Sequence, residues 1–311
     1  MAATGEIAVI YAAMRTALAL GLALTLAACS GSSSSVDGPD AAVTVDAPAG
    51  GSVAPVLPAP TGTCPTIAAG DVTFAPAGIP TRKVKLALDP AAASETGELV
   101  IYWHATGSSP AEAGYALGTT QQAITARGGI VATPYSDDAA GQFEWFLVNN
   151  SPKLDDFLVA DEIVACLAAA HRIDTRHIHS MGMSAGGLQT TAFSFLRAHY
   201  IASVATFSGG MPDGFDPPNQ EPANKFAALI FDGGASDNVF GVDFKAASEA
   251  YQAKLAASGH FARICDHGKG HNIPLDAAPS IAAFFTANGF GAWPSPFAAG
   301  LPSTFPAYCA H

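Results

Sequence analysis

The sequence predicts an α/β fold, in which a mainly parallel central sheet is flanked by helices. Short runs rich in β-branched and aromatic residues alternate along the chain with longer amphipathic runs, as expected of strands joined by helical crossovers. One run, residues 99–103 (Leu-Val-Ile-Tyr-Trp), is apolar at every position, which is typical of a strand that helices cover on both faces. Together these observations favour parallel strands with right-handed connections.

The expected strands can be taken in order. Residues 82–88 alternate polar and apolar side chains and stop at Asp89 and Pro90, which indicates a half-exposed strand. A second short strand ends at Pro134, because proline removes a backbone donor. The complete set of expected strands is 82–88, 99–103, 130–133, 177–180, 202–207, 227–231 and 261–265.

Helices are expected in the intervals between these strands. One ends near Arg127, where two glycines follow. Another opens at Asp155 and Asp156, whose negative charges suit a helix N-terminus, and repeats apolar residues at helical spacing as far as His171. Further helices are expected at 185–199, 243–258 and 277–288.

The N-terminus has the pattern of a signal peptide over residues 1–28, with Arg15 before an apolar run and small residues before Cys29. Leu26-Ala27-Ala28-Cys29 resembles a bacterial lipobox. This resemblance implies that Cys29 becomes the lipid-modified first residue of a protein exported to the cell envelope, anchored at the outer membrane or secreted. Residues 1–13 contain no positive charge, so Met14 is the expected start.

Residues 29–63 are dominated by Ser, Gly, Pro and Ala, with few apolar side chains. Such a segment cannot bury enough surface to offset the entropy of ordering, so a disordered tether is expected. No second segment of this composition follows, and residues 64–311 are expected to form one domain. The net charge of −12, with only 14 Lys and Arg residues, excludes a nucleic-acid-binding protein, which needs a basic surface.

Four cysteines remain once Cys29 is taken as lipidated. An even number in an exported protein favours two disulfides, and four buried thiols are the alternative. Three pairings are possible, and the sequence does not separate them. We favour Cys64 with Cys309, which would join the two ends of the domain, and therefore Cys166 with Cys265.

The segment Gly182-Met183-Ser184-Ala185-Gly186-Gly187 follows an expected strand and precedes an expected helix. A Gly-x-Ser-x-Gly pattern in this position is typical of a nucleophile elbow, a sharp turn that leaves a serine hydroxyl exposed. At the carboxyl edge of a parallel sheet this segment would meet three other loops, residues 104–109, 232–238 and 266–272. These loops add a candidate oxyanion-binding segment, an acid and a base.

Three motifs together resemble the secreted esterases grouped with polyhydroxybutyrate depolymerases and feruloyl or acetylxylan esterases. They are the serine motif, Phe231-x-Gly-x-x-x-Asp237-x-Val239, and Gly270-His271-Asn272-Ile273-Pro274. The similarity covers about 82–289 and implies the α/β-hydrolase fold. It implies Ser184 as nucleophile, Asp237 as acid and His271 as base, with the order Ser, Asp, His along the chain.

The resemblance also implies an oxyanion hole made by the N–H of Ala185 and a group of Thr106. Where relatives have His-Gly, this chain has His104 and Ala105, so the geometry of this loop is left open. Asp232 is a second candidate for the acid, although the position of Asp237 fits better. His104 and Trp145 are the candidate substrate-binding residues.

A metal site at His267 and His271 is disfavoured, because Gly268 and Gly270 make a helix there improbable, and no metal or cofactor is expected. The expected partner is an ester, small or polymeric, and the oligomeric state stays open. Two alternatives to an esterase remain. A serine peptidase would use the same three residues, and a surface lipoprotein could keep the fold as an inactive binding module.

Overall fold

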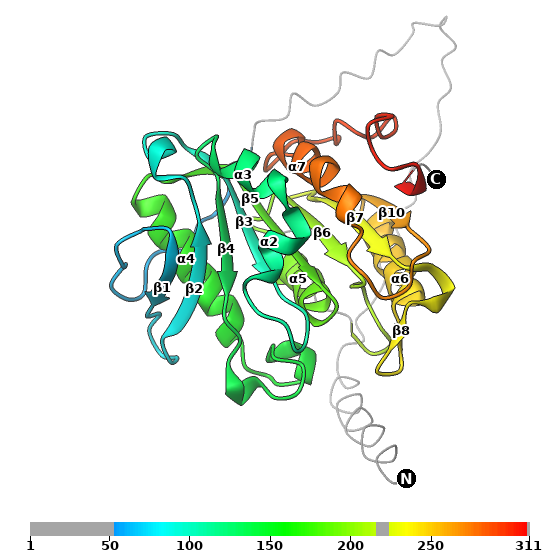
Figure 1. Ribbon diagram of the computed structural model, residues 1–311, viewed down its shortest axis with the longest axis horizontal. Coiled ribbons are helices and arrows are strands. Elements are labelled where there is room, and N and C mark those ends of the chain that lie inside the picture. Colours follow the sequence, from blue (N-terminus) through cyan, green and yellow to red (C-terminus); the bar gives the residue numbers. More distant parts are fainter. Residues whose placement is uncertain (1–52, 216–223, 310–311) are drawn as a thin grey trace, which may run out of the picture. The chain divides into compact units, whose positions relative to one another are not determined.

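The computed structural model describes residues 53–215 and 224–309, which belong to one unit that begins at Ser52 (Figure 1). The expected signal peptide, Cys29 and residues 29–52 of the expected tether lie outside the described residues. None of the helices within the described ranges is both long enough and apolar enough to cross a membrane.

Eight strands form the central sheet, in the order β1-β2-β4-β3-β5-β6-β7-β10. The pairs β1–β2 and β2–β4 are antiparallel, and every pair from β4 to β10 is parallel. The α/β fold class is therefore confirmed. The strands are β1 (Gly70–Phe74), β2 (Arg82–Ala87), β3 (Gly97–Trp103), β4 (Ile130–Pro134), β5 (Ile173–Met183), β6 (Ser203–Phe207), β7 (Ala227–Asp232) and β10 (Phe261–Asp266).

Helices cover both faces of the sheet (Figure 1). One face carries α4 (Asp155–Ala169), α5 (Ala185–Leu196) and α6 (Phe244–Ala257), and the other carries α2 (Glu112–Leu117), α3 (Thr119–Thr125) and α7 (Ala278–Ala287). The helix expected before Arg127 is divided into α2 and α3. Gly118, at φ 53° and ψ −132°, leaves the helical region and causes this break.

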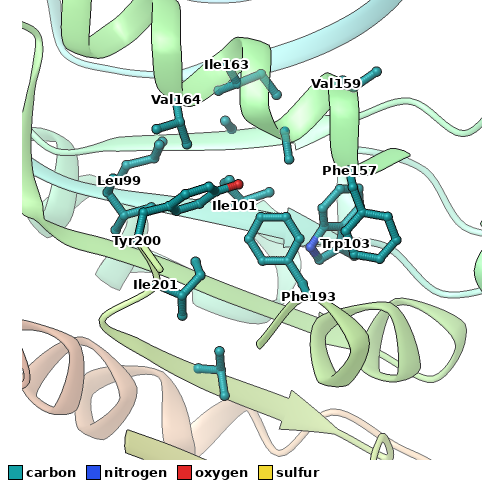
Figure 2. Close-up of a cluster of buried hydrophobic side chains, with 14 of the residues drawn as sticks. Leu99, Ile101, Trp103, Phe157, Val159, Ile163, Val164, Phe193, Tyr200 and Ile201 are labelled. Atoms are coloured by element: carbon teal, nitrogen blue, oxygen red, sulfur yellow. The ribbon is translucent and has the colours of Figure 1, made fainter. Parts of the chain in front are cut away.

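The central strand β3 is buried on both faces, as the apolar run predicts. Leu99, Ile101 and Trp103 pack toward α4 and α5, whereas Val100 and Tyr102 pack toward α2 and α7, and all five are 0% exposed. Figure 2 shows side chains of α4 and α5 gathered around Trp103, where its ring lies 5.7 Å from that of Phe193. This packing fixes the end of β3, from which the first loop of the site departs.

Two disulfides join Cys64 to Cys166 and Cys265 to Cys309, so all four cysteines pair as expected, but the pairing that we favoured is wrong. Cys64 and Cys309 pack into different core clusters, one on each face of the sheet. The N-terminal segment is bonded to α4, and the C-terminal 3-10 helix at Ala307–Cys309 packs against β10. Each disulfide therefore fixes one terminal segment to the layer beside it.

The unit that the structure describes begins before the boundary expected at residue 64. Residues 53–63 form no helix or strand, but they are attached to the domain: Val56 N–H donates to His199 O at 2.9 Å. The amides of Thr61 and Gly62 donate to the two carboxylate oxygens of Glu162, at 2.8 and 2.9 Å. The low apolar content of this segment does not reveal these contacts, because backbone amides make the hydrogen bonds, and Leu57 alone of its three large apolar residues packs against the core.

Candidate active site

Ser184 lies at the sharp turn between β5 and α5. Its backbone has φ 57° and ψ −118°, a conformation that costs a residue with a side chain about 1–3 kcal/mol. The turn is held by Ser184 N–H, which donates to Phe207 O at 2.9 Å, and by Leu188 N–H, which donates to Ser184 O at 2.9 Å. The elbow expected from the sequence is present, with Ser184 8% exposed.

The glycines of the motif are required by close backbone contacts. A Cβ atom on Gly182 would collide with the carbonyl oxygens of Gly186 and Trp103, and one on Gly186 would collide with Trp103 O. On Gly187, a Cβ would lie 2.7 Å from Phe207 O. The helix α5 can therefore begin directly against the ends of β3 and β6 only if these positions lack side chains.

A continuous hydrogen-bond chain links Ser184, His271 and Asp237. His271 follows β10, and Asp237 follows β7 and the 3-10 turn Gly234–Ser236. Ser184 Oγ lies 2.9 Å from His271 Nε2, and His271 Nδ1 lies 2.7 Å from Asp237 Oδ1. Because the carboxylate can only accept, Nδ1 carries the proton and Nε2 is free to take one from Ser184.

The carboxylate of Asp237 is almost fully buried and accepts several hydrogen bonds. Its second oxygen accepts from Ser208 Oγ–H and from Gly233 N–H, each at 2.8 Å. Burial alone would raise the pKa of Asp237, but the bonds from His271, Gly233 and Ser208 outweigh burial and lower this pKa. Sequence reasoning missed Ser208; its one signal was a serine at the end of an expected strand.

Asp232 has a different environment. Its Oδ1 accepts from Gly234 N–H at 2.9 Å, and Oδ2 has no hydrogen-bond partner among the described residues. Burial raises the pKa of Asp232 to about 6. The geometry thus gives His271 the carboxylate of Asp237, the position that the motif favours.

The loop after β3, residues 104–107, supplies the other wall of the site. Ala105 N–H donates to Glu112 Oε1 and Gly107 N–H donates to Glu144 Oε1, both at 3.1 Å. Among the described residues, nothing accepts a hydrogen bond from the amides of Thr106 and Ala185. The hydroxyl of Thr106 is also buried without a partner. The expected oxyanion donors are therefore the unused donors of this loop and of the elbow.

The structure buries His104 and Trp145, the two residues that were expected to bind the substrate. His104 is 1% exposed and Trp145 is 0% exposed, so neither offers a surface to a ligand. Trp145 Nε1–H instead donates to His104 O at 3.0 Å, and the ring of Trp145 packs on that of Trp103 at 5.1 Å. Sequence alone could not separate a buried aromatic residue from one that lines a pocket.

A short hairpin of β8 (Asn238–Val239) and β9 (Val242–Asp243) follows Asp237 directly. Helix α6 then begins at Phe244, whose amide donates to Asp237 O at 2.9 Å and whose ring lies 4.7 Å from that of His271. Within the described ranges, the one group spaced for a metal is Cys64, Glu162 and Cys166, whose cysteines are joined as a disulfide.

Solved structures of other proteins share this arrangement of elements. The native form of pOPH is 15% identical, with a TM-score of 0.60 over 73% of this chain and 90% of pOPH. A thermostable esterase is also 15% identical, with a TM-score of 0.57 over 70% of this chain and 62% of the esterase. These likenesses show that the chain has the α/β-hydrolase fold.

The acylaminoacyl peptidase of Pyrococcus horikoshii has the same fold and is 12% identical, with a TM-score of 0.51. The match covers 70% of this chain but only 41% of the peptidase. No protein-family model and no curated protein matches the sequence.

Proposed function

We propose that the chain is an exported serine esterase that hydrolyses carboxylic esters through an acyl-enzyme. The observation that carries this proposal is the hydrogen-bond chain from Ser184 Oγ through His271 to Asp237. A serine, a histidine and a buried aspartate in this geometry form the arrangement that activates a hydroxyl for acyl transfer.

In the first half of the reaction, Ser184 Oγ attacks the carbonyl carbon of the ester while His271 Nε2 takes the hydroxyl proton. The tetrahedral intermediate then collapses as the bond to the alkoxide breaks, and His271 returns the proton to this leaving group. Asp237 holds the Nδ1–H tautomer through the 2.7 Å bond and stabilises the transient imidazolium. Its lowered pKa keeps the carboxylate ionised for this role.

In the second half, water takes the place of the alcohol. His271 Nε2 removes a proton from the water as its oxygen attacks the acyl carbon, and the proton then passes to Ser184 Oγ as the acid leaves. The negative charge of each intermediate would be bound by the unused amides of Ala185 and Thr106. One such donor typically contributes about 100- to 1,000-fold to the rate.

The fold alone does not choose between an ester and an amide substrate. The esterase proposal is supported by the resemblance of the three motifs to the depolymerase and feruloyl esterase group. Its substrates would be hydroxyalkanoate oligomers or polymers, or feruloyl or acetyl esters of polysaccharide. The peptidase alternative has weaker support, since the chain spans less than half of the acylaminoacyl peptidase.

Export is supported by the two disulfides, because such bonds persist in oxidising compartments. We propose that Cys29 carries the lipid that retains the protein at the cell envelope. Mass spectrometry of the protein isolated from membranes tests this, since a lipidated N-terminal Cys29 has a mass that simple cleavage of the signal peptide does not produce.

Hydrolysis of p-nitrophenyl acetate by the full chain tests the activity. Ser184→Ala should reduce kcat by about 10,000-fold or more, because the nucleophile is removed. Ser94→Ala is the matched control, since Ser94 is exposed and takes no part in the site. Turnover that survives in Ser184→Ala would disprove the assigned nucleophile.

The same preparation separates the alternatives. A p-nitroanilide of the same acyl group should be hydrolysed far more slowly than the ester, and the opposite order would favour the peptidase. A folded wild-type protein that turns over neither compound would favour the inactive binding module.

A further inference from the structure

One peptide group in the loop 104–107 is fixed from both sides. The amide before it, Ala105 N–H, is bonded to Glu112, and the amide after it, Gly107 N–H, is bonded to Glu144. Between these two fixed amides lies the peptide that joins Ala105 to Thr106 and carries the unused N–H of Thr106. The direction of that N–H therefore depends on both carboxylates.

The second oxygen of Glu144 reaches the same peptide through His104. Glu144 Oε2 lies 3.4 Å from His104 Nδ1, which also lies 3.0 Å from Ala105 O. Both neighbours of Nδ1 are acceptors, so this nitrogen carries the proton and donates it to Ala105 O. That carbonyl belongs to the peptide that carries Thr106 N–H. Glu144 thus favours the Nδ1–H tautomer of His104, and this tautomer fixes the plane of the Ala105–Thr106 peptide by its bond to Ala105 O.

The backbone at Glu144 is itself strained and is held by its neighbours. Glu144 has φ +67°, a conformation that favours glycine. On one side, Phe143 N–H donates to Asn149 Oδ1 at 3.1 Å, and on the other side Trp145 is fully buried and donates to His104 O. Strain of this kind persists only where the surroundings impose it, and it is concentrated at functional sites.

We propose that Glu144 is a positioning residue that aims the N–H of Thr106 at the oxyanion of the esterase reaction. The inference rests on the function proposed above. Glu144 touches Gly107 and His104, and it acts on the reacting oxygen only through them. The role is new to the site, because no sequence motif includes Glu144.

The variant Glu144→Gly tests this role without disturbing the fold. Glycine accepts φ +67° more readily than glutamate, so the thermal midpoint Tm should stay equal or rise. We expect kcat for p-nitrophenyl acetate to fall about 10- to 100-fold, less than for complete loss of an oxyanion donor, with KM within about 3-fold. Activity and stability would then move independently.

Two further variants sharpen the result. Glu144→Gln keeps an amide oxygen that can accept from Gly107 N–H but places an NH2 donor beside His104 Nδ1, so its kcat should fall less than that of Glu144→Gly. Glu95→Ala is the matched control, because Glu95 is exposed and lies outside the site. Phenylboronic acid, which forms a tetrahedral adduct with a reactive serine, should bind Glu144→Gly more weakly by the factor that kcat/KM loses.

The outcomes separate this inference from the proposed function. Wild-type turnover that depends on Ser184 together with an unchanged kcat in Glu144→Gly would overturn the role of Glu144 alone. A loss in Glu144→Gln as large as in Glu144→Gly, or a fall in Tm that matches the loss of activity, would also overturn it. An inactive wild type would overturn both proposals.

Discussion

The elbow that carries Ser184 and the loop 104–107 face the same site, but their shapes have different origins. The elbow is shaped by residues adjacent in sequence, since Gly182 and Gly186 allow the backbone to turn against Trp103 O. The loop is shaped from a distance, by Glu144, 37 residues from Gly107, and Trp145, 41 residues from His104. A local constraint can be predicted from a motif, whereas a distant one becomes visible only in the fold.

Of the changes to the residues that shape the elbow and the loop, Gly186→Ala should reduce stability and activity most, because it removes the glycine that lets the elbow turn against Trp103 O. The new Cβ collides with backbone rather than with a movable side chain, so β3 and α5 must separate. We expect a loss of about 3 kcal/mol or more in the free energy of unfolding, measured with urea, and at least a 100-fold loss of ester hydrolysis.

The control for this change is Gly114→Ala in α2. A Cβ there meets only the end of the Gln121 side chain, at 3.3 Å, and alanine is the better helix former. Its free energy of unfolding should change by no more than about 1 kcal/mol. Equal stability of the two variants would show that the elbow does not depend on its glycines.

The same distinction explains how much of the fold could be predicted. Strand positions followed from apolar runs, and β3 is buried throughout as its composition indicates. The edge strand β1 was missed because its five residues include only two buried apolar side chains, Val72 and Phe74. The disulfide pairing failed for another reason: it depends on which layer each terminal segment reaches, and this is a property of the tertiary structure.

For the site, the sequence identified the three residues that the structure brings together, because each belongs to a short motif at a strand end. It assigned His104 and Trp145 to the substrate, although both are buried. It missed Glu112 and Glu144, since a carboxylate that accepts from a distant backbone amide leaves no pattern along the chain.

Glu112→Ala should reduce activity and stability by an intermediate amount, because it removes the carboxylate that, besides Glu144, holds the loop 104–107. Glu112 Oε1 accepts from Ala105 N–H and from the hydroxyl of Tyr102, which is 0% exposed. Each donor left without an acceptor should lower the free energy of unfolding by about 1–3 kcal/mol. The value of kcat should fall about 10-fold or more. These changes are measured by urea denaturation and ester hydrolysis.

Tyr102→Phe is the matched change that leaves the loop supported. It removes one hydrogen bond of Glu112 and keeps the bond to Ala105, so kcat should stay within about 3-fold and stability should fall by about 1 kcal/mol. If Tyr102→Phe reduced kcat as much as Glu112→Ala, the bond to Ala105 would not be the support that matters.

Asp232→Asn should have the smallest effect on activity, and its effect on stability should depend on pH. The buried carboxyl of Asp232 has a pKa raised to about 6 from an ordinary value of 3.8. Between these pH values the unfolded chain releases the proton while the folded protein keeps it, so the native state loses stability as pH rises. Above pH 6 Asp232 is ionised in both states, and its buried charge lowers the free energy of unfolding by on the order of 1–3 kcal/mol.

Asparagine carries no charge and keeps an oxygen for Gly234 N–H. The free energy of unfolding of the variant, relative to that of the wild type, should therefore increase as the pH rises from 4 to 7.5. Urea denaturation at both pH values measures this difference, and comparison with the wild type cancels Asp156, whose pKa is also raised to about 6. Ester hydrolysis should stay within about 3-fold, because Asp237 rather than Asp232 bonds His271. If the stability difference between the two proteins did not change with pH, ionisation of Asp232 would not destabilise the native state. Burial would then not explain why the pKa of Asp232 differs from that of Asp237.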